Sequence, residues 1–526
     1  MRADADVAVV GAGFAGSLTA LALRSIGRSV ALVERGRHPR FAIGESSTPL
    51  ANLLLEELAD RYDLPRIRVF SKWGTWQRAR PDVGGGLKRG FTFFFHQPGE
   101  RFGDDPDHER QLMVAASPHD DIGDTHWYRP DFDHNLVREA EAAGAIYIDE
   151  TAIDRVAIDR GRSTLEGTRL GQSVRISASF VVDASGPRGF LSRSLSLGDR
   201  PLRWLPPTQG LYTHFEHVTR WDRLTPQAGA PYPPDDAAVH HVFPGGWIWM
   251  LRFNNGITSA GAALTAATAA HLSAADAASA WDHLLVTVPS VREQFADARA
   301  VRPWIHAPQL AFRTSRVAGP GWALLPSAAG VIDPLLSTGF PLTLLGIQRL
   351  LAILERTSLG PEHEAALREY ERITLAELDA TEQLVAALYT SMGDAPLFKR
   401  LTLLYFAAAS FSETARRLGR PDLAPGFLLH AHPMFGPDLH ACTMIALARP
   451  HGRARDALLE ELDRVVEPFD IAGLLDRTRR DWYPVQADDL IRNAAKLRAS
   501  EIDIERLLER CGFNPTFREP SSPRAT

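Results

Sequence analysis

The chain has 526 residues, of which 45% are hydrophobic and 23% are charged, and its formal net charge is −6. These values are typical of a soluble globular protein with more than one domain or subdomain, and the lack of a basic run argues against nucleic acid as the main partner. Cys442 and Cys511 are too few for a disulfide framework. Because no apolar stretch is long enough to span a membrane and the start does not resemble a signal peptide, the sequence predicts a cytoplasmic protein.

The first forty residues predict a dinucleotide-binding unit. A short apolar strand over 7–10 leads into a GxGxxG turn, a helical segment over 17–26 and a second strand that ends in an acid. In such a unit the glycines allow a tight turn and close approach of the backbone to a pyrophosphate, and the acid accepts hydrogen bonds from a ribose. The predicted cofactor-binding residues here are Gly11, Gly13, Phe14, Ala15, Gly16, Glu34 and Arg35.

Three later segments favour FAD over NAD as the dinucleotide. They are GESSTP at 44–49, the arginine that precedes an amphipathic helix within 126–145, and a buried strand that ends within 179–189. Their order resembles the flavoproteins of the p-hydroxybenzoate hydroxylase type, which implies a Rossmann-like α/β domain with FAD extended across it. Taken singly, the arginine could cap a helix and the strand-end aspartate could lie in a turn. The resemblance implies further cofactor contacts at Glu45, Ser46, Arg129, Asp183 and Ala184.

The segment GGGLKRGFTFFFHQPGE at 84–100 places Lys88 and Arg89 before a run of phenylalanines that a core would bury. An unpaired buried ammonium is costly, so two interpretations are open. Either Lys88 ends a strand with its head in solvent, or its ammonium is held in an aromatic cavity for chemistry. Arg89 is the alternative candidate to face inward. The predicted substrate-pocket residues of this segment are Phe91, Phe93 and Phe95.

Residues 190–320 predict a sheet that lies over the flavin. In GGWIWML the tryptophans Trp247 and Trp249 are two residues apart in a strand pattern, so their side chains share one face. They are predicted to line the substrate pocket, although a pair of core aromatics fits the pattern equally well.

A second strand–loop–helix pattern lies within 321–355. Unpaired amides at a helix start can hold a small anion, and a glycine there allows close approach. The residues alone favour a simpler interpretation, in which Ser337 or Thr338 caps the helix. Asp333 and Gly339 are the predicted cofactor-binding residues of this segment.

From about residue 360 the apolar residues recur at helical spacing. The sequence therefore predicts an FAD-binding core over 1–355, with the substrate sheet mainly within 190–320. A helical region over 356–526 would cover the substrate side. The histidines and the cysteine of segment 430–442 are not expected to bind a metal, because a flavin mechanism has no use for one.

Three motifs from distant parts of the chain together resemble the flavin-dependent halogenases. They are GGLKRGFTFFFH, GGWIWML and DPLLSTGF. The resemblance covers most of 5–350 and implies that Lys88 is the catalytic lysine and that the amides of Thr338 and Gly339 bind halide beside the flavin. Leu336 occupies the position of a glutamate in tryptophan halogenases, which argues against tryptophan and favours a phenol, a pyrrole or an aromatic polyketide.

Two departures from the family pattern carry expectations of their own. Leu251-Arg252 replaces Ile-Pro after the tryptophans, and Pro326-Ser327 replaces the usual Gly-Asp. The second change predicts weak, exchangeable binding of flavin. The replacement of Ile-Pro by Leu251-Arg252 leaves an alternative function open. The chain could be an FAD-dependent aromatic monooxygenase or oxidase of the same fold, in which Arg252 marks the loss of halogenation.

The resemblance also implies the reaction and its partners. FADH2 from a separate flavin reductase, O2 and chloride or bromide would give hypohalous acid, a small and unselective oxidant. Lys88 would carry the halogen to an electron-rich aromatic of secondary metabolism, either free or bound to a carrier protein, because a desolvated lysine can lose its proton. No metal, nucleic acid or membrane partner is expected, and a homodimer is compatible with the sequence.

Overall fold

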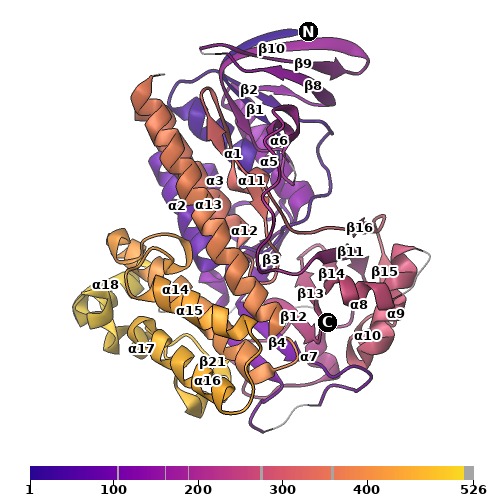
Figure 1. Cartoon of the computed structure of the whole chain (residues 1–526), viewed down its shortest axis with the longest axis vertical. Coiled ribbons are helices and arrows are strands. Elements are labelled where there is room, and N and C mark those ends of the chain that lie inside the picture. Colours follow the sequence, from indigo (N-terminus) through magenta and orange to yellow (C-terminus); the bar gives the residue numbers. More distant parts are fainter. Residues whose placement is uncertain (104–105, 160, 188, 273–275, 357–359, 514–526) are drawn as a thin grey trace.

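The computed structural model describes residues 1–103, 106–159, 161–187, 189–272, 276–356 and 360–513, and Figure 1 shows their arrangement. The parts of the predicted region 356–526 at 357–359 and 514–526 lie outside the described residues. Two main sheets carry helices on their faces, and a mainly helical layer follows from residue 361 (Figure 1). No helix of the described part is both long and apolar enough to cross a bilayer.

The helices are α1 Phe14–Ser25, α2 Pro49–Arg61, α3 Pro65–Arg68, α4 Trp73–Ala79, α5 Arg129–Ala142, α6 Phe190–Ser194, α7 Trp221–Leu224, α8 Ala266–His271, α9 Ala277–Thr287, α10 Pro289–Gln294, α11 Pro326–Ala329, α12 Gly339–Arg356, α13 Pro361–Thr390, α14 Ala395–Arg417, α15 Phe435–Leu447, α16 Arg453–Val466, α17 Ala487–Arg492 and α18 Glu501–Arg510. The strands are β1 Arg2–Val10, β2 Val30–Val33, β3 Gly85–Lys88, β4 Gly90–Phe95, β5 Gln111–Ala115, β6 Asp124–Trp127, β7 Ile146–Ile148, β8 Thr151–Ala157, β9 Ser163–Arg169, β10 Gln172–Asp183, β11 Thr208–Glu216, β12 Ala238–Phe243, β13 Gly246–Arg252, β14 Thr258–Thr265, β15 Arg299–Ala300, β16 Ile305–Ala307, β17 Phe312–Arg313, β18 Ala318–Gly319, β19 Trp322–Leu324, β20 Gly330–Val331 and β21 Trp482–Tyr483.

The first sheet has the order β18-β19-β10-β1-β2-β7, and β1 lies parallel between β2 and β10. The last four residues of β1 are apolar and buried, as a parallel strand covered on both faces requires. The carboxyl ends of β1, β10 and β19 meet at one edge, where ligands of such sheets bind. The Rossmann-like α/β fold predicted from the sequence is confirmed. Helix α1 begins at Phe14, earlier than the predicted residue 17, because Gly13 occupies the N-cap position.

The second sheet has the order β15-β11-β14-β13-β12-β4-β5-β21. It extends beyond the predicted range of 190–320, since β4 and β5 come from before it and β21 from the helical layer. Every residue of β4 is buried, and β4 lies parallel to β12 at the centre of the sheet. Local sequence patterns do not reveal such distant strand pairing, which explains why the prediction missed it.

Helix α13 joins the helical layer to the rest of the fold, since it contacts β18, α12, α14 and α15 (Figure 1). Its anchor is Arg313, whose guanidinium is fully buried and donates to Asp379 (2.6 Å), Glu382 (2.8 Å) and the Leu375 carbonyl oxygen (3.2 Å). Glu382 also accepts hydrogen bonds from the Arg203 and Trp204 amides. One buried ion pair thus holds α13 against strand β17 and the loop at 203–204.

Arg313→Ala should lower the free energy of unfolding by about 3–5 kcal/mol, because it leaves the buried Glu382 carboxylate without its cation. Chemical denaturation followed by circular dichroism measures the change. Arg372→Ala is the matched control, since Arg372 forms an exposed pair with Glu369 on the same helix. Its loss should change the free energy of unfolding far less, because solvent screens an exposed ion pair. Equal losses for the two variants would contradict the anchoring role.

Candidate functional site

The glycine loop after β1 is shaped by two different constraints. Gly11 has a φ of +102°, and a Cβ there would overlap the carbonyl oxygen of Ala184. Gly13 has an extended backbone, and the nearest atoms to a Cβ there are Arg129 Nη2 at 3.5 Å and Arg40 Nη2 at 3.6 Å. The first glycine is needed by the fold, whereas the second faces a space bounded by two guanidinium groups.

Glu34 at the end of β2 holds this loop in place. Its carboxylate accepts hydrogen bonds from the Ala12 amide (3.0 Å) and the Gly36 amide (2.9 Å), and it pairs with Arg40 at 3.0 Å. Burial opposes ionisation, but Arg40 and the two amides together lower the pKa of Glu34. The carboxylate is therefore charged beside the loop. Arg35 is exposed next to it.

Arg129 is the first residue of α5 and is buried. Its guanidinium pairs with both carboxylate oxygens of Asp133 at 2.7 Å and donates to the Ile43 and Gly44 carbonyl oxygens at 3.1 and 2.8 Å. It also lies over the ring of Phe14, 5.0 Å from the centroid. Arg129 thus ties the 43–44 loop to the glycine loop.

Asp183 ends β10 and is fully buried. It accepts hydrogen bonds from the amide and hydroxyl of Ser185 and from the Leu191 amide, so it shapes the turn after the strand. Burial raises its pKa. The adjacent Ala184 contributes the carbonyl oxygen that faces Gly11.

These residues fit an anionic dinucleotide such as FAD. The glycine loop opens the start of α1, whose amides favour negative charge, and Arg40 and Arg129 lie beside it. At the position of the usual Gly-Asp, Pro326 instead packs α11 against α12, since a Cβ on Gly346 would overlap the proline ring.

The loop that leads into α12 has the features of a small-anion site. Ser337 has a φ of +54°, Thr338 is buried, and Gly339 is exposed with no atom within 4 Å of where a Cβ would stand. Among the described residues, the amides of Thr338 and Gly339 make no hydrogen bond to protein. Phe340 follows and contacts Phe14 at a centroid distance of 4.8 Å, which places this loop beside the glycine loop.

Asp333, just before that loop, is buried beneath the tryptophan strand. It accepts hydrogen bonds from the Tyr389 hydroxyl (2.8 Å) and the Leu335 amide (3.0 Å). Burial raises its pKa to about 7. Trp247 donates to Tyr389 at 3.2 Å, so Asp333 belongs to a buried chain of polar groups that fixes the indole.

Lys88 is fully buried, which excludes the interpretation that places its head in solvent. Its ammonium donates to Ser46 Oγ at 2.9 Å and to the Ser47 carbonyl oxygen at 2.5 Å, and it lies 3.7 Å from the centroid of the Phe91 ring. Arg89 turns the other way and pairs with Asp120 at 2.7 Å. Burial lowers the pKa of Lys88 to about 7.

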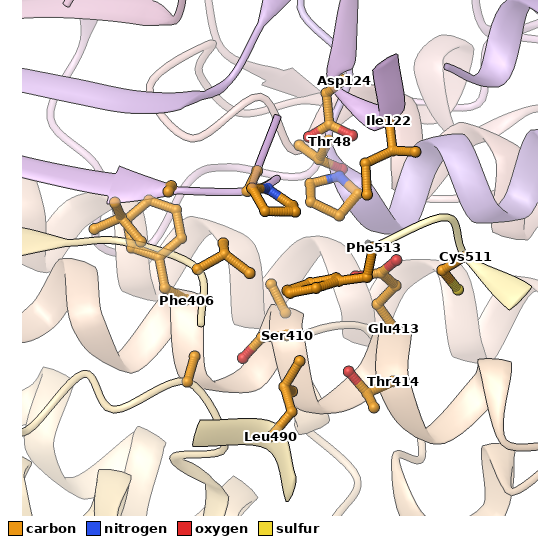
Figure 2. Close-up of a pocket in the computed structure, with 18 of the residues that line it drawn as sticks. Thr48, Ile122, Asp124, Phe406, Ser410, Glu413, Thr414, Leu490, Cys511 and Phe513 are labelled. Atoms are coloured by element: carbon orange, nitrogen blue, oxygen red, sulfur yellow. The ribbon is translucent and has the colours of Figure 1, made fainter. Parts of the chain in front are cut away.

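A cavity of about 180 Å³ lies between the N-terminal part of the chain and the helical layer (Figure 2). Lys88 is not among its lining residues, but Phe91, whose ring the ammonium contacts, and Asp124, its cross-strand partner, are. Thr48, Ile122 and Asp124 form one side, and Ser410, Glu413 and Thr414 of α14 form the opposite side. Further wall residues come from the last part of the chain, among them Leu490, Leu507, Cys511 and Phe513. The lining is mostly apolar, with few charged groups.

The loop of residues 44–48 connects the dinucleotide end, Lys88 and the cavity. Gly44 lies beside Arg129 and Phe340, Ser46 and Ser47 hold Lys88, and Thr48 reaches the cavity. Residues 44–48 therefore run from the dinucleotide end, past the lysine, to the apolar cavity.

Comparisons with known proteins identify the family. The sequence profile of the family described as "Tryptophan halogenase" matches residues 126–404, and that of "FAD dependent oxidoreductase" matches residues 6–120. Monodechloroaminopyrrolnitrin halogenase PrnC of Pseudomonas fluorescens is 30% identical over 74% of this chain and 68% of its own. Tetracycline 7-halogenase of Kitasatospora aureofaciens is 30% identical over 77% of this chain and 73% of its own length. The chain belongs to the flavin-dependent halogenases.

The fold of this halogenase is shared with a solved relative. The structure of halogenase PltM in complex with phloroglucinol and FAD superposes with a TM-score of 0.82 at 24% identity, covering 90% of this chain and 99% of that one. The family match and the two relatives at 30% identity confirm the resemblance on which the sequence prediction rested, and the enzyme is an FAD-dependent halogenase.

The predicted pocket residues of the halogenase separate into two groups. Phe91 lines the cavity, whereas Phe93, Phe95, Trp247 and Trp249 are absent from the described cavity lining. They are buried behind it, and His240 stacks between Phe93 (4.4 Å) and Trp247 (5.1 Å). As predicted, Trp247 and Trp249 share a face, with ring centroids 5.6 Å apart.

Sequence reasoning missed several polar groups around Lys88 and the flavin loop. Asp124 is the cross-strand partner of Lys88, Asn52 donates to Asp124, and His240 lies in the aromatic row. Glu45 was predicted, but not its fully buried partner His214 at 2.8 Å. The alternation in DTHW, with Asp124 and His126 on one face, is the only signal that could have pointed to Asp124.

Gly13→Val should lower the thermal unfolding midpoint by no more than a few degrees, because the nearest described atoms to the new Cβ, chain neighbours aside, are the ends of side chains, with Arg129 Nη2 at 3.5 Å and Arg40 Nη2 at 3.6 Å. It should weaken FAD binding by about tenfold or more, since the side chain would occupy the space beside the loop amides. Quenching of FAD fluorescence measures the affinity. Gly11→Ala is the contrasting variant and should destabilise the fold itself; normal FAD affinity in Gly13→Val would contradict the assignment.

Proposed function

We propose that this halogenase uses reduced FAD, O2 and chloride or bromide to form hypohalous acid, which Lys88 directs onto an electron-rich aromatic in the cavity. The observation that carries this proposal is the position of Lys88. Its ammonium is buried against the 44–48 loop, which runs from the dinucleotide end to the cavity. The role of Lys88 goes beyond family membership and rests on this geometry.

The cofactor would be held by the glycine loop, Glu34, Arg129 and the 44–46 loop. When bound, reduced FAD supplies together with O2 the two-electron oxidation of halide. Glu34 keeps the loop amides in place, and Arg129 and Arg40 offset the negative charge of a pyrophosphate. Because the Asp of the usual Gly-Asp is missing, we expect flavin to exchange readily, which suits supply by a separate flavin reductase.

The halide would bind to the amides of Thr338 and Gly339. These groups stand at the start of an 18-residue helix, where backbone donors carry partial positive charge. The glycine leaves the approach open, and the contact between Phe340 and Phe14 keeps the site beside the glycine loop.

Lys88 would guide hypohalous acid by hydrogen bonding or by forming a haloamine. Ser46, Ser47 and the Phe91 ring fix its ammonium, so the halogen would be presented at one place. Desolvation allows a neutral amine near neutral pH, which an arginine would not provide. The row of His240, Trp247 and Trp249 would separate substrate from flavin.

The size of the cavity supports a compact aromatic as substrate. Its volume of about 180 Å³ is near that of cavities known to bind benzene, so it favours a one-ring phenol or pyrrole over a larger polyketide. The helical region from residue 356 would close this side. We further propose that the enzyme acts in the cytoplasm in secondary-metabolite biosynthesis, with a homodimer as a compatible assembly.

Lys88→Ala should lose at least about 100-fold in product formation while flavin oxidation continues, because the halogen is made but no longer directed. The assay uses reduced FAD, air and chloride or bromide with phenols such as resorcinol and phloroglucinol and with pyrroles, and mass spectrometry detects the halogen isotope pattern. Lys88→Arg should not rescue it.

A reaction without halide is the control for the monooxygenase alternative. Oxygenated product formed in the absence of chloride and bromide would contradict the proposed reaction. Unchanged chlorination by Lys88→Ala would contradict the role of the lysine alone.

A further inference from the structure

We propose that Asp124 is a second catalytic residue, which accepts the ring proton of the aromatic substrate and returns it to Lys88. This inference rests on the proposed function, since it assumes that Lys88 delivers the halogen.

Asp124 and Lys88 are fixed relative to each other by strand register. In the antiparallel ribbon of β3 and β6, Lys88 lies directly opposite Asp124. Side chains of directly opposed residues project to the same face of a ribbon. Both residues are buried, and both belong to short strands held by the neighbouring 44–48 loop, where Ser47 pairs with Thr125.

Asp124 reaches the cavity, and one of its two carboxylate oxygens is free to accept a proton. Asn52 donates to Oδ1 at 2.7 Å, whereas Oδ2 has no hydrogen-bond partner among the described residues. Figure 2 shows its carboxylate on the cavity wall opposite Glu413. Glu413 differs because Arg417 pairs with it at 2.6 Å. A base that must receive a proton needs such a free lone pair.

The charges around Asp124 make proton exchange with Lys88 easy. Burial raises the pKa of Asp124 and lowers that of Lys88, so the two approach each other. Besides Lys88, Glu413 and Arg417 of α14 act on Asp124, and His126 and His240 lie near Lys88 with pKa values lowered by burial. Ammonium with carboxylate and amine with carboxylic acid are both neutral overall, so neither form leaves a net charge buried.

The proton balance closes over one turnover. The ring carbon attacks the halogen of hypohalous acid, the carbon–halogen bond forms and the oxygen–halogen bond breaks. Hydroxide leaves with a proton from the Lys88 ammonium as water, and the ring proton passes to the Asp124 carboxylate. A bridging water then passes that proton from Asp124 to the Lys88 amine, which restores the starting state.

The test compares Asp124→Asn with wild type in the holoenzyme assay, using ring-deuterated resorcinol and phloroglucinol beside the unlabelled phenols. We expect a loss of about 100-fold or more in kcat with a smaller change in KM, and continued flavin oxidation. A primary isotope effect absent from wild type should appear, because loss of the ring proton becomes slow. A merely structural role for Asp124 would lower activity without an isotope effect.

The matched control is Asp120→Asn, which removes the carboxylate that pairs with Arg89 next to Lys88, and its product yield should equal that of wild type. Asp124→Glu keeps a carboxylate one methylene away and should recover part of the chlorination. If Asp124→Asn does not fold, Asp124→Glu replaces it in the test, since a displaced base should still give an isotope effect. Chlorination by Asp124→Asn within twofold of wild type would overturn the proposal.

A second readout needs neither flavin nor substrate. Sub-stoichiometric hypochlorite is added to wild type and Asp124→Asn over a pH series, and peptide mass spectrometry measures the haloamine on Lys88. Removing the carboxylate that favours the ammonium should shift haloamine formation to lower pH. Identical profiles would overturn the pairing. If wild type halogenates no aromatic, the proposed function fails, whereas this shift still decides whether Asp124 and Lys88 are coupled.

Discussion

The burial of one ammonium group determines how the rest of the site is arranged. Lys88 is shielded from solvent and forms no ion pair with any described residue, so Ser46, Ser47 and the Phe91 ring hold its charge. This requirement fixes the 44–48 loop against the β3–β6 ribbon. Because the same loop contacts Arg129 at one end and the cavity at the other, solvating the lysine also connects the cofactor end to the substrate end.

The fold and the cofactor half of the site could be read from the sequence because their signals are local. The glycine spacing, the acid at Glu34 and the strand that ends at Asp183 each lie within a few residues of the element they define. Even here, what the side chains do was only partly predictable. The carboxylates of Glu34 and Asp183 accept hydrogen bonds from loop amides, and these bonds position the backbone that would contact the cofactor.

The substrate half could not be read in the same way, since it depends on contacts between distant segments. The pairing of β4 with β12, the partner of Lys88 at Asp124 and a cavity wall built from residues near 410 and 510 all join parts of the chain that no periodicity relates. The phenylalanines predicted to line the pocket, Phe91, Phe93 and Phe95, alternate along one face of β4. Only Phe91 lines the cavity, because the rings of Phe93 and Phe95 farther along the strand pack against Phe398 of α14.

The departure at Arg252 shows how a charged residue can be accommodated without altering the tryptophan pair. Arg252 lies at the end of β13 on the face opposite Trp249, and its guanidinium donates to Asp235 (2.7 Å) and to the Val218 and Thr219 carbonyl oxygens (2.9 and 2.8 Å). A proline would stiffen the strand end through its ring, whereas the arginine stiffens it by binding two neighbouring loops. The charge is neutralised away from the aromatic row, so Arg252 gives no physical reason for halogenation to be lost.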